Sequence, residues 1–160
     1  MRHTLTAILL ALFATAGLGC KGSDALLVRG DIDVVVDVNT TLQVDFPDDT
    51  RLVRSPVATD GRVAGVCNID GSVNPATFSV SVHRTPSTDP IVESLTVRDD
   101  LVQVTIQGEL YEAAPGTTCD ISTLYIDSDR ELSVGVVVDC AVTGNAGTVT
   151  VVGELHFDGC

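Results

Sequence analysis

The sequence contains no tryptophan, one methionine and one lysine, and aromatic residues make up only 4% of it. Sites that bind sugars or stack nucleic-acid bases are built on aromatic side chains, so this scarcity disfavours both kinds of site. After residue 20, no segment repeats its apolar residues with the 3.6-residue period of an amphipathic helix. The sequence therefore predicts a domain without long helices.

Positive charge is also scarce. The 160 residues include 9 Lys and Arg against 22 Asp and Glu, a formal net charge of −13. This balance excludes nucleic acid as a partner and disfavours binding to an anionic membrane surface. Seventeen of the acidic residues are Asp, whose short side chain favours turns and caps over helix interiors.

The N-terminal segment has the layout of an export signal. Arg2 and His3 precede an apolar run over residues 5–13, and small residues follow up to Gly19. A basic start, a short apolar run and a small-residue cleavage zone are typical of such signals. The apolar run is shorter than the roughly 20 residues that span a bilayer, so we do not expect a membrane helix here.

Gly17, Leu18, Gly19 and Cys20 follow the apolar run, and this box resembles the cleavage and lipidation site of bacterial lipoproteins. The resemblance covers only the first twenty or so residues. It implies that residues 1–19 are removed, that Cys20 receives acyl chains including palmitate, and that the protein is anchored in the cell envelope. Lys21 follows the cysteine where Asp would favour inner-membrane retention, so the outer membrane is favoured. The alternative is cleavage after Ala16 and secretion as a soluble protein.

The number of cysteines supports lipidation. The chain has five, and an odd number in an exported protein needs an explanation. If Cys20 carries the lipid, four remain, which is enough for two disulfides in an oxidising compartment. Removing residues 1–19 leaves 141 residues with eight basic and 22 acidic side chains, hence a net charge of −14.

Apolar residues alternate with polar ones almost everywhere after residue 30, and valine is abundant. This period of two predicts strands with one buried face. We expect a lipidated cysteine and short tether over residues 20–30 and a single all-β domain over residues 31–160. About nine strands are expected, at 31–38, 41–46, 62–69, 76–83, 91–98, 101–111, 119–127, 131–141 and 147–157. Many short strands predict an antiparallel β-sandwich, with an antiparallel β-barrel as the alternative.

The expected register suggests how the four remaining cysteines pair. A loop over residues 128–131 sets Cys119 opposite Cys140 with both side chains inward, which suits a disulfide. Cys67 and Cys160 then remain for the second bridge. A zinc or redox site is disfavoured because no pair has C-x-x-C spacing.

No motif predicts a catalytic, metal or cofactor site. His83 and His156 fall on polar strand faces, and no G-x-S-x-G elbow is present, so a hydrolase is disfavoured. None of the acidic clusters matches a calcium-binding loop; these clusters are Asp31/Asp33/Asp37, Asp48/Asp49, Asp99/Asp100 and Asp127/Asp129. The sequence thus predicts a non-enzymatic envelope module that binds another protein or has a structural role, with a calcium-modulated binding domain and a secreted hydrolase as alternatives.

Overall fold

The computed structural model describes residues 26–59, 61–73, 75–87, 89–113, 119–127 and 132–160. Cys20 and the predicted signal lie outside these residues. Ten strands make up the domain: β1 (Leu26–Asp37), β2 (Thr40–Arg54), β3 (Ala64–Asp70), β4 (Thr77–His83), β5 (Val92–Arg98), β6 (Leu101–Ile106), β7 (Glu109–Ala113), β8 (Cys119–Asp127), β9 (Ser133–Gly144) and β10 (Gly147–Asp158). No helix in the described part of the chain has the length and apolar character needed to cross a membrane.

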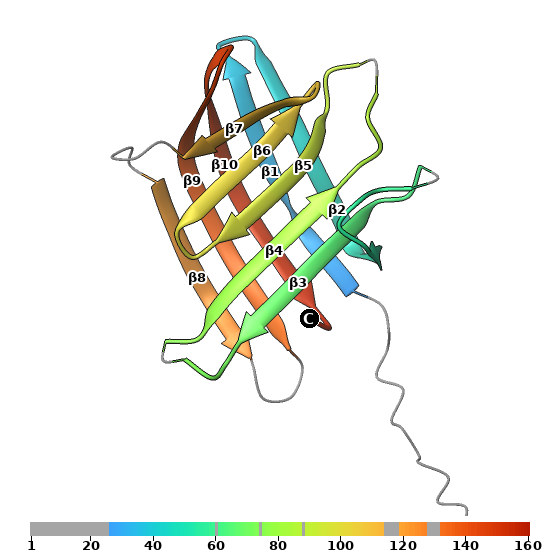
Figure 1. The fold of residues 1–160 in the computed structure, drawn as a ribbon, viewed down its shortest axis with the longest axis vertical. Helices are drawn as coiled ribbons and strands as arrows, with labels where there is room; N and C mark the ends of the chain where they lie inside the picture. Colours follow the sequence, from blue (N-terminus) through green and yellow to red (C-terminus); the bar gives the residue numbers. More distant parts are fainter. Residues whose placement is uncertain (1–25, 60, 74, 88, 114–118, 128–131) are drawn as a thin grey trace, which may run out of the picture.

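Hydrogen bonds connect all ten strands in the order β10-β1-β2-β3-β4-β5-β6-β7-β9-β8, with a further pairing between β10 and β9. The sheet folds over into two layers (Figure 1): β3 to β7 lie nearer the viewer and cross over β8, β9, β10, β1 and β2. The layers meet at two short junctions. β2 and β3 are parallel over two residue pairs, and β7 meets β9 over two more. The predicted all-β sandwich is confirmed.

The core lies between the two layers, because alternation along each strand turns one set of apolar side chains inward. Phe157, Leu26, Ile32, Leu95 and Leu155 are the largest of the fully buried side chains.

Three apolar cross-strand pairs join strands that the sequence predicted: Val142 with Val149, Val97 with Val102, and Leu95 with Val104. Each pair places two apolar side chains on the core face, and the structure confirms this part of the prediction.

The strand predicted over residues 101–111 is wrong, because the chain turns at Gln107 and Gly108. Both residues have positive φ, 51° and 76°, and they join β6 to β7 as a two-residue hairpin turn. The turn pairs Val104 with Tyr111, so Tyr111 is buried and Leu110 is 49% exposed. A straight strand would have given the opposite result for Leu110, since it shares the parity of Val104.

The tether predicted over residues 20–30 is also wrong at its C-terminal end. β1 begins at Leu26, which is fully buried with Val28, so residues 26–30 belong to the domain. Likewise, β2 runs to Arg54, well beyond the strand predicted at residues 41–46. There Val28 pairs with Thr50 and Gly30 with Phe46, so the residues between Phe46 and Thr50 bulge out of the ladder.

Candidate functional site

Two disulfides use the four cysteines of the domain. Cys67 on β3 is joined to Cys160, and Cys119 on β8 is joined to Cys140 on β9. This is the pairing that the sequence favoured. The bridge to Cys160 ties the C-terminal residue, which follows β10, to the opposite layer. Arg54 reinforces it by donating hydrogen bonds to the carbonyl oxygens of Gly159 and Cys160.

A bulge in β8 preserves the register of the second bridge. The predicted loop over residues 128–131 would set Asp127 opposite Leu132. In the structure, Asp127 pairs with Ser133, one residue further along the chain. The register then shifts between Thr123 and Tyr125, and Cys119 arrives directly opposite Cys140. The extra residue at the loop is therefore compensated by one extra residue in the strand.

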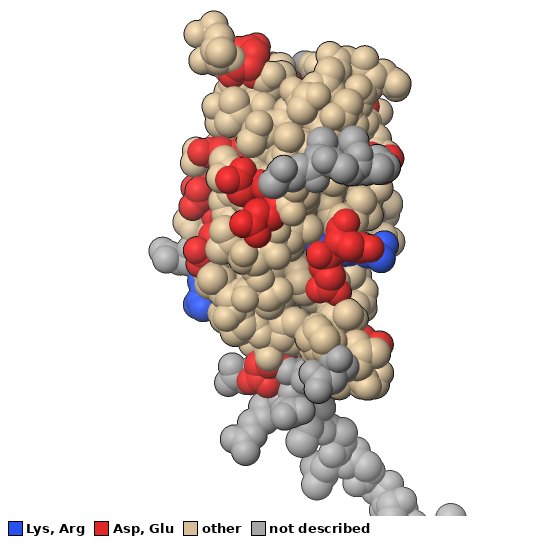
Figure 2. All heavy atoms as spheres, turned by 90° about the vertical axis from the view of Figure 1, so that its left-hand side faces the viewer, with Lys and Arg blue, Asp and Glu red and all other residues tan. Residues whose placement is uncertain are grey.

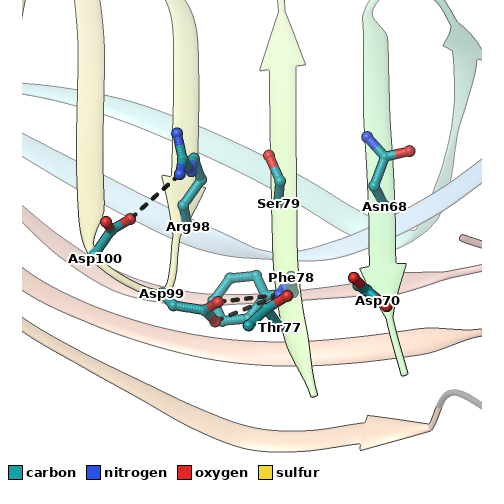
Figure 3. Close-up of a pocket in the computed structure, with 8 residues that line it drawn as sticks. All are labelled: Asn68, Asp70, Thr77, Phe78, Ser79, Arg98, Asp99 and Asp100. Carbon is teal, nitrogen blue, oxygen red and sulfur yellow. Dashed lines mark hydrogen bonds and ion pairs between the residues drawn. The ribbon is translucent and has the colours of Figure 1, made fainter. Parts of the chain in front are cut away.

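A polar pocket of about 610 Å³ lies where β3, β4 and the β5–β6 turn come together (Figure 3). Its lining contains amide, hydroxyl, guanidinium and carboxylate groups around a single aromatic residue; the residues are Asn68, Asp70, Thr77, Phe78, Ser79, Arg98, Asp99 and Asp100. No histidine or cysteine is among these described residues. The pocket therefore offers hydrogen-bonding groups without a nucleophile paired to a base.

Each carboxylate in this pocket already has a partner within the protein. Asp99 accepts the backbone N–H of Phe78 at 3.3 Å, and Asp100 lies 3.6 Å from the guanidinium of Arg98. The hydroxyl and backbone N–H of Ser72 donate to Asp70 at 2.5 and 2.9 Å. These bonds hold the pKa of the Asp70 carboxyl below its usual value. These three carboxylates thus stabilise the ends of the strands around the pocket.

We expect Asp99→Ala to lower the free energy of unfolding by about 1–2 kcal/mol, because it leaves the part-buried backbone N–H of Phe78 without its acceptor. Asp100→Ala is the matched control. It removes only an exposed ion pair and should change stability by less than about 0.5 kcal/mol. Urea unfolding of both variants measures the difference, and equal losses would contradict the role of Asp99.

His83 forms the one serine–histidine contact among the described residues. Its Nε2 lies 3.0 Å from the hydroxyl of Ser81, two residues before it on β4. Burial lowers the pKa of His83, which favours the neutral imidazole. A hydrolytic triad also needs a carboxylate on the other ring nitrogen. Within the described part of the chain, no carboxylate hydrogen-bonds to it.

His156 lies in a row of polar side chains on the outward face of the layer formed by β8, β9, β10, β1 and β2. Its Nδ1 is 3.1 Å from the hydroxyl of Tyr125, and its Nε2 is 2.5 Å from a carboxylate oxygen of Glu154. Burial, followed by the charge of Asp158, raises the pKa of Tyr125. The hydroxyl is therefore protonated at neutral pH and can donate to Nδ1, which leaves the Nε2–H to donate to Glu154.

Gly135 makes this row possible. A Cβ at this position would lie 2.7 Å from Cε1 of Tyr125 and 3.0 Å from Nδ1 of His156, so a larger residue would displace these two rings. The rings of Tyr125 and His156 stack across the glycine with centroids 5.7 Å apart. This contact was not predicted from the sequence. Its signal was a glycine between Val134 and Val136 of β9, with which an aromatic residue on the next strand pairs.

The same outward face carries acidic residues directly opposite one another. Asp31 on β1 pairs with Asp45 on β2 and with Glu154 on β10, and Asp120 on β8 pairs with Asp139 on β9. Acidic side chains outnumber basic ones on the side of the molecule that Figure 2 shows. Like charges in such cross-strand pairs repel one another.

Acidic side chains do not gather into a metal site in the described residues, where no three His, Cys, Asp or Glu are placed to hold one ion. Asp129 of the predicted acidic clusters lies outside these residues. The surface is thus strongly negative without a cation-binding centre in the part of the chain that the structure describes.

Comparisons with known proteins do not assign this chain to a family. No family model, no curated protein and no solved structure matches the chain.

Proposed function

We propose that this chain is an exported envelope protein that a lipid on Cys20 anchors to a membrane, and that its β-sandwich is a non-enzymatic module for binding another envelope protein. The observation that carries the proposal is the pairing of the cysteines. The two bridges use Cys67, Cys119, Cys140 and Cys160 and leave Cys20 as the fifth. Disulfides of this kind persist in oxidising compartments outside the cytoplasm.

The distance between Cys20 and the domain is consistent with such an anchor. Six residue steps separate Cys20 from Leu26, the first residue of β1, and span at most about 20 Å when fully extended. The end of the sandwich at which β1 begins would therefore lie next to the bilayer. The net charge of −14 would repel anionic headgroups, which leaves the faces of the sandwich available to a protein partner.

The anchor can be tested by metabolic labelling with a fatty-acid analogue. We expect the wild-type protein to take up the label and to fractionate with membranes. Cys20→Ser should lose the label completely and move to the soluble fraction, because no other residue is proposed to carry acyl chains.

Ser23→Ala, three residues away, is the matched control and should keep the label. Label that persists in Cys20→Ser, or a wild-type protein that is never labelled, would refute the anchor.

A further inference from the structure

Strand β8 leaves one edge of the sheet open. Among the described strands it pairs only with β9, whereas the pairing of β10 with β9 and the junctions at β3 and β7 give every other strand at least two neighbours. An open edge presents unpaired backbone N–H and C=O groups to any extended segment. β8 also contains neither proline nor lysine, two residues that commonly protect such edges.

The disulfide shows which backbone groups of β8 point toward the open edge. The Cα atoms of Cys119 and Cys140 are 4.2 Å apart, a separation typical of a non-hydrogen-bonded antiparallel pair. Hydrogen-bonded and non-hydrogen-bonded pairs alternate along the ladder, so Ile121 and Thr123 are also in non-hydrogen-bonded pairs with β9. Their N–H and C=O groups therefore point away from β9, toward the open edge.

The side chains along this edge differ between its two faces. Ile121 and Ile126 are half-buried and pack against the core, so an added strand would cover them further. Asp120 and Ser122 are exposed on the outward face, and Asp120 lies opposite Asp139. A basic side chain beside Asp120 would offset the repulsion between these two carboxylates.

We propose that β8 accepts an extended basic segment of a partner protein as an additional antiparallel strand. The segment would alternate Arg or Lys, beside Asp120, with apolar residues that extend the core face beside Ile121. This inference names the site and partner of the binding module proposed above and so rests on that function. A second copy of this chain is a poorer occupant, because each copy carries a net charge of −14.

The test measures binding of the full-length protein, purified in detergent, to a fluorescent peptide of alternating valine and arginine. In antiparallel addition, the valine that faces Ile121 exchanges hydrogen bonds with it, whereas the N–H groups of the arginines point to solvent. N-methylation of the valines should weaken binding at least about tenfold. N-methylation of the arginines should leave binding nearly unchanged. Equal effects of the two modifications would overturn strand addition.

Two protein variants test the site itself. Thr123→Pro removes a backbone N–H that points toward the open edge, and should weaken binding about tenfold. Proline is tolerated at such an exposed edge position. Thr123→Val keeps this N–H and should leave binding unchanged. Asp120→Lys should weaken binding about tenfold. Asp45→Lys, on the same face four strands away, should have little effect.

Binding that is insensitive to both Thr123→Pro and Asp120→Lys would overturn the proposal. Self-association of the wild-type chain that Thr123→Pro abolishes would also overturn it, in favour of a second copy. None of these variants touches Cys20, so fatty-acid labelling separates a failure of this inference from a failure of the anchor.

Discussion

Replacing Cys67 and Cys160 together by alanine is expected to lower the free energy of unfolding by about 5 kcal/mol. The bridge closes a loop with a sequence separation of 93 residues, and the entropy that a cross-link removes from the unfolded chain grows with loop length. The bridge also holds the end of β10 against β3, in the opposite layer. Urea unfolding in a Cys20→Ser background, without reductant, measures the loss.

The second bridge provides the matched comparison. Cys119 and Cys140 are separated by only 21 residues, so replacing both by alanine should cost about 3 kcal/mol. The order of the two losses follows from loop length alone. A loss below about 1 kcal/mol for the Cys67/Cys160 variant, or the reverse order, would contradict this account of the bridges.

Gly153→Ala is expected to destabilise the protein by about 3 kcal/mol or more. Gly153 has a φ of 148°, and a Cβ there would collide with the carbonyl oxygen of Asp31 on β1. A side chain adds strain of about 1–3 kcal/mol at such a φ, and backbone in a paired strand cannot move aside without breaking the ladder. The melting temperature of the purified variant reports the loss.

Gly61→Ala separates the two causes. Gly61 has a φ of 70° but has no atom within 4 Å of the position of a Cβ, so it should lose only the strain, about 1 kcal/mol. Gly30→Ala should behave like Gly153→Ala, because its Cβ would meet the carbonyl oxygen of Glu154. If Gly61→Ala and Gly153→Ala cost the same, close packing between β1 and β10 is not the reason for these glycines.

Much of the fold was predictable because alternation specifies which face of each strand is buried. Once the turn at residues 145–146 is placed, the pairing of Val142 with Val149 follows, since any shift by one residue would turn the valines outward. The same reasoning set Cys119 opposite Cys140. The connection between β8 and β9 is one residue longer than predicted. The predicted pair of cysteines is still correct, because a bulge at residue 124 restores the register.

The errors arose where backbone conformation overrides the pattern. The run from Val104 to Leu110 keeps its alternation across Gln107 and Gly108, so the pattern continues through the turn between β6 and β7. Pro47 and its neighbours have the composition of a turn. They remain within β2 as a bulge, because Phe46 before them and Thr50 after them both pair with β1.

The pocket and the open edge depend on topology, which alternation does not specify. Asn68 and Asp99 line one pocket because β3, β4 and β5 are neighbours, and β8 has an open side because β7 pairs with β9 instead. Both features require the order of the strands, which many sequences with the same pattern would not share.

Mass spectrometry of the non-reduced protein, purified from membranes and digested, tests the allocation of the five cysteines most directly. The account predicts one disulfide-linked peptide pair joining Cys67 to Cys160, a second joining Cys119 to Cys140, and an N-terminal peptide that begins at an acylated Cys20. A chain that still begins at Met1 with all five thiols reduced, or a peptide that joins Cys67 to Cys119, would contradict it.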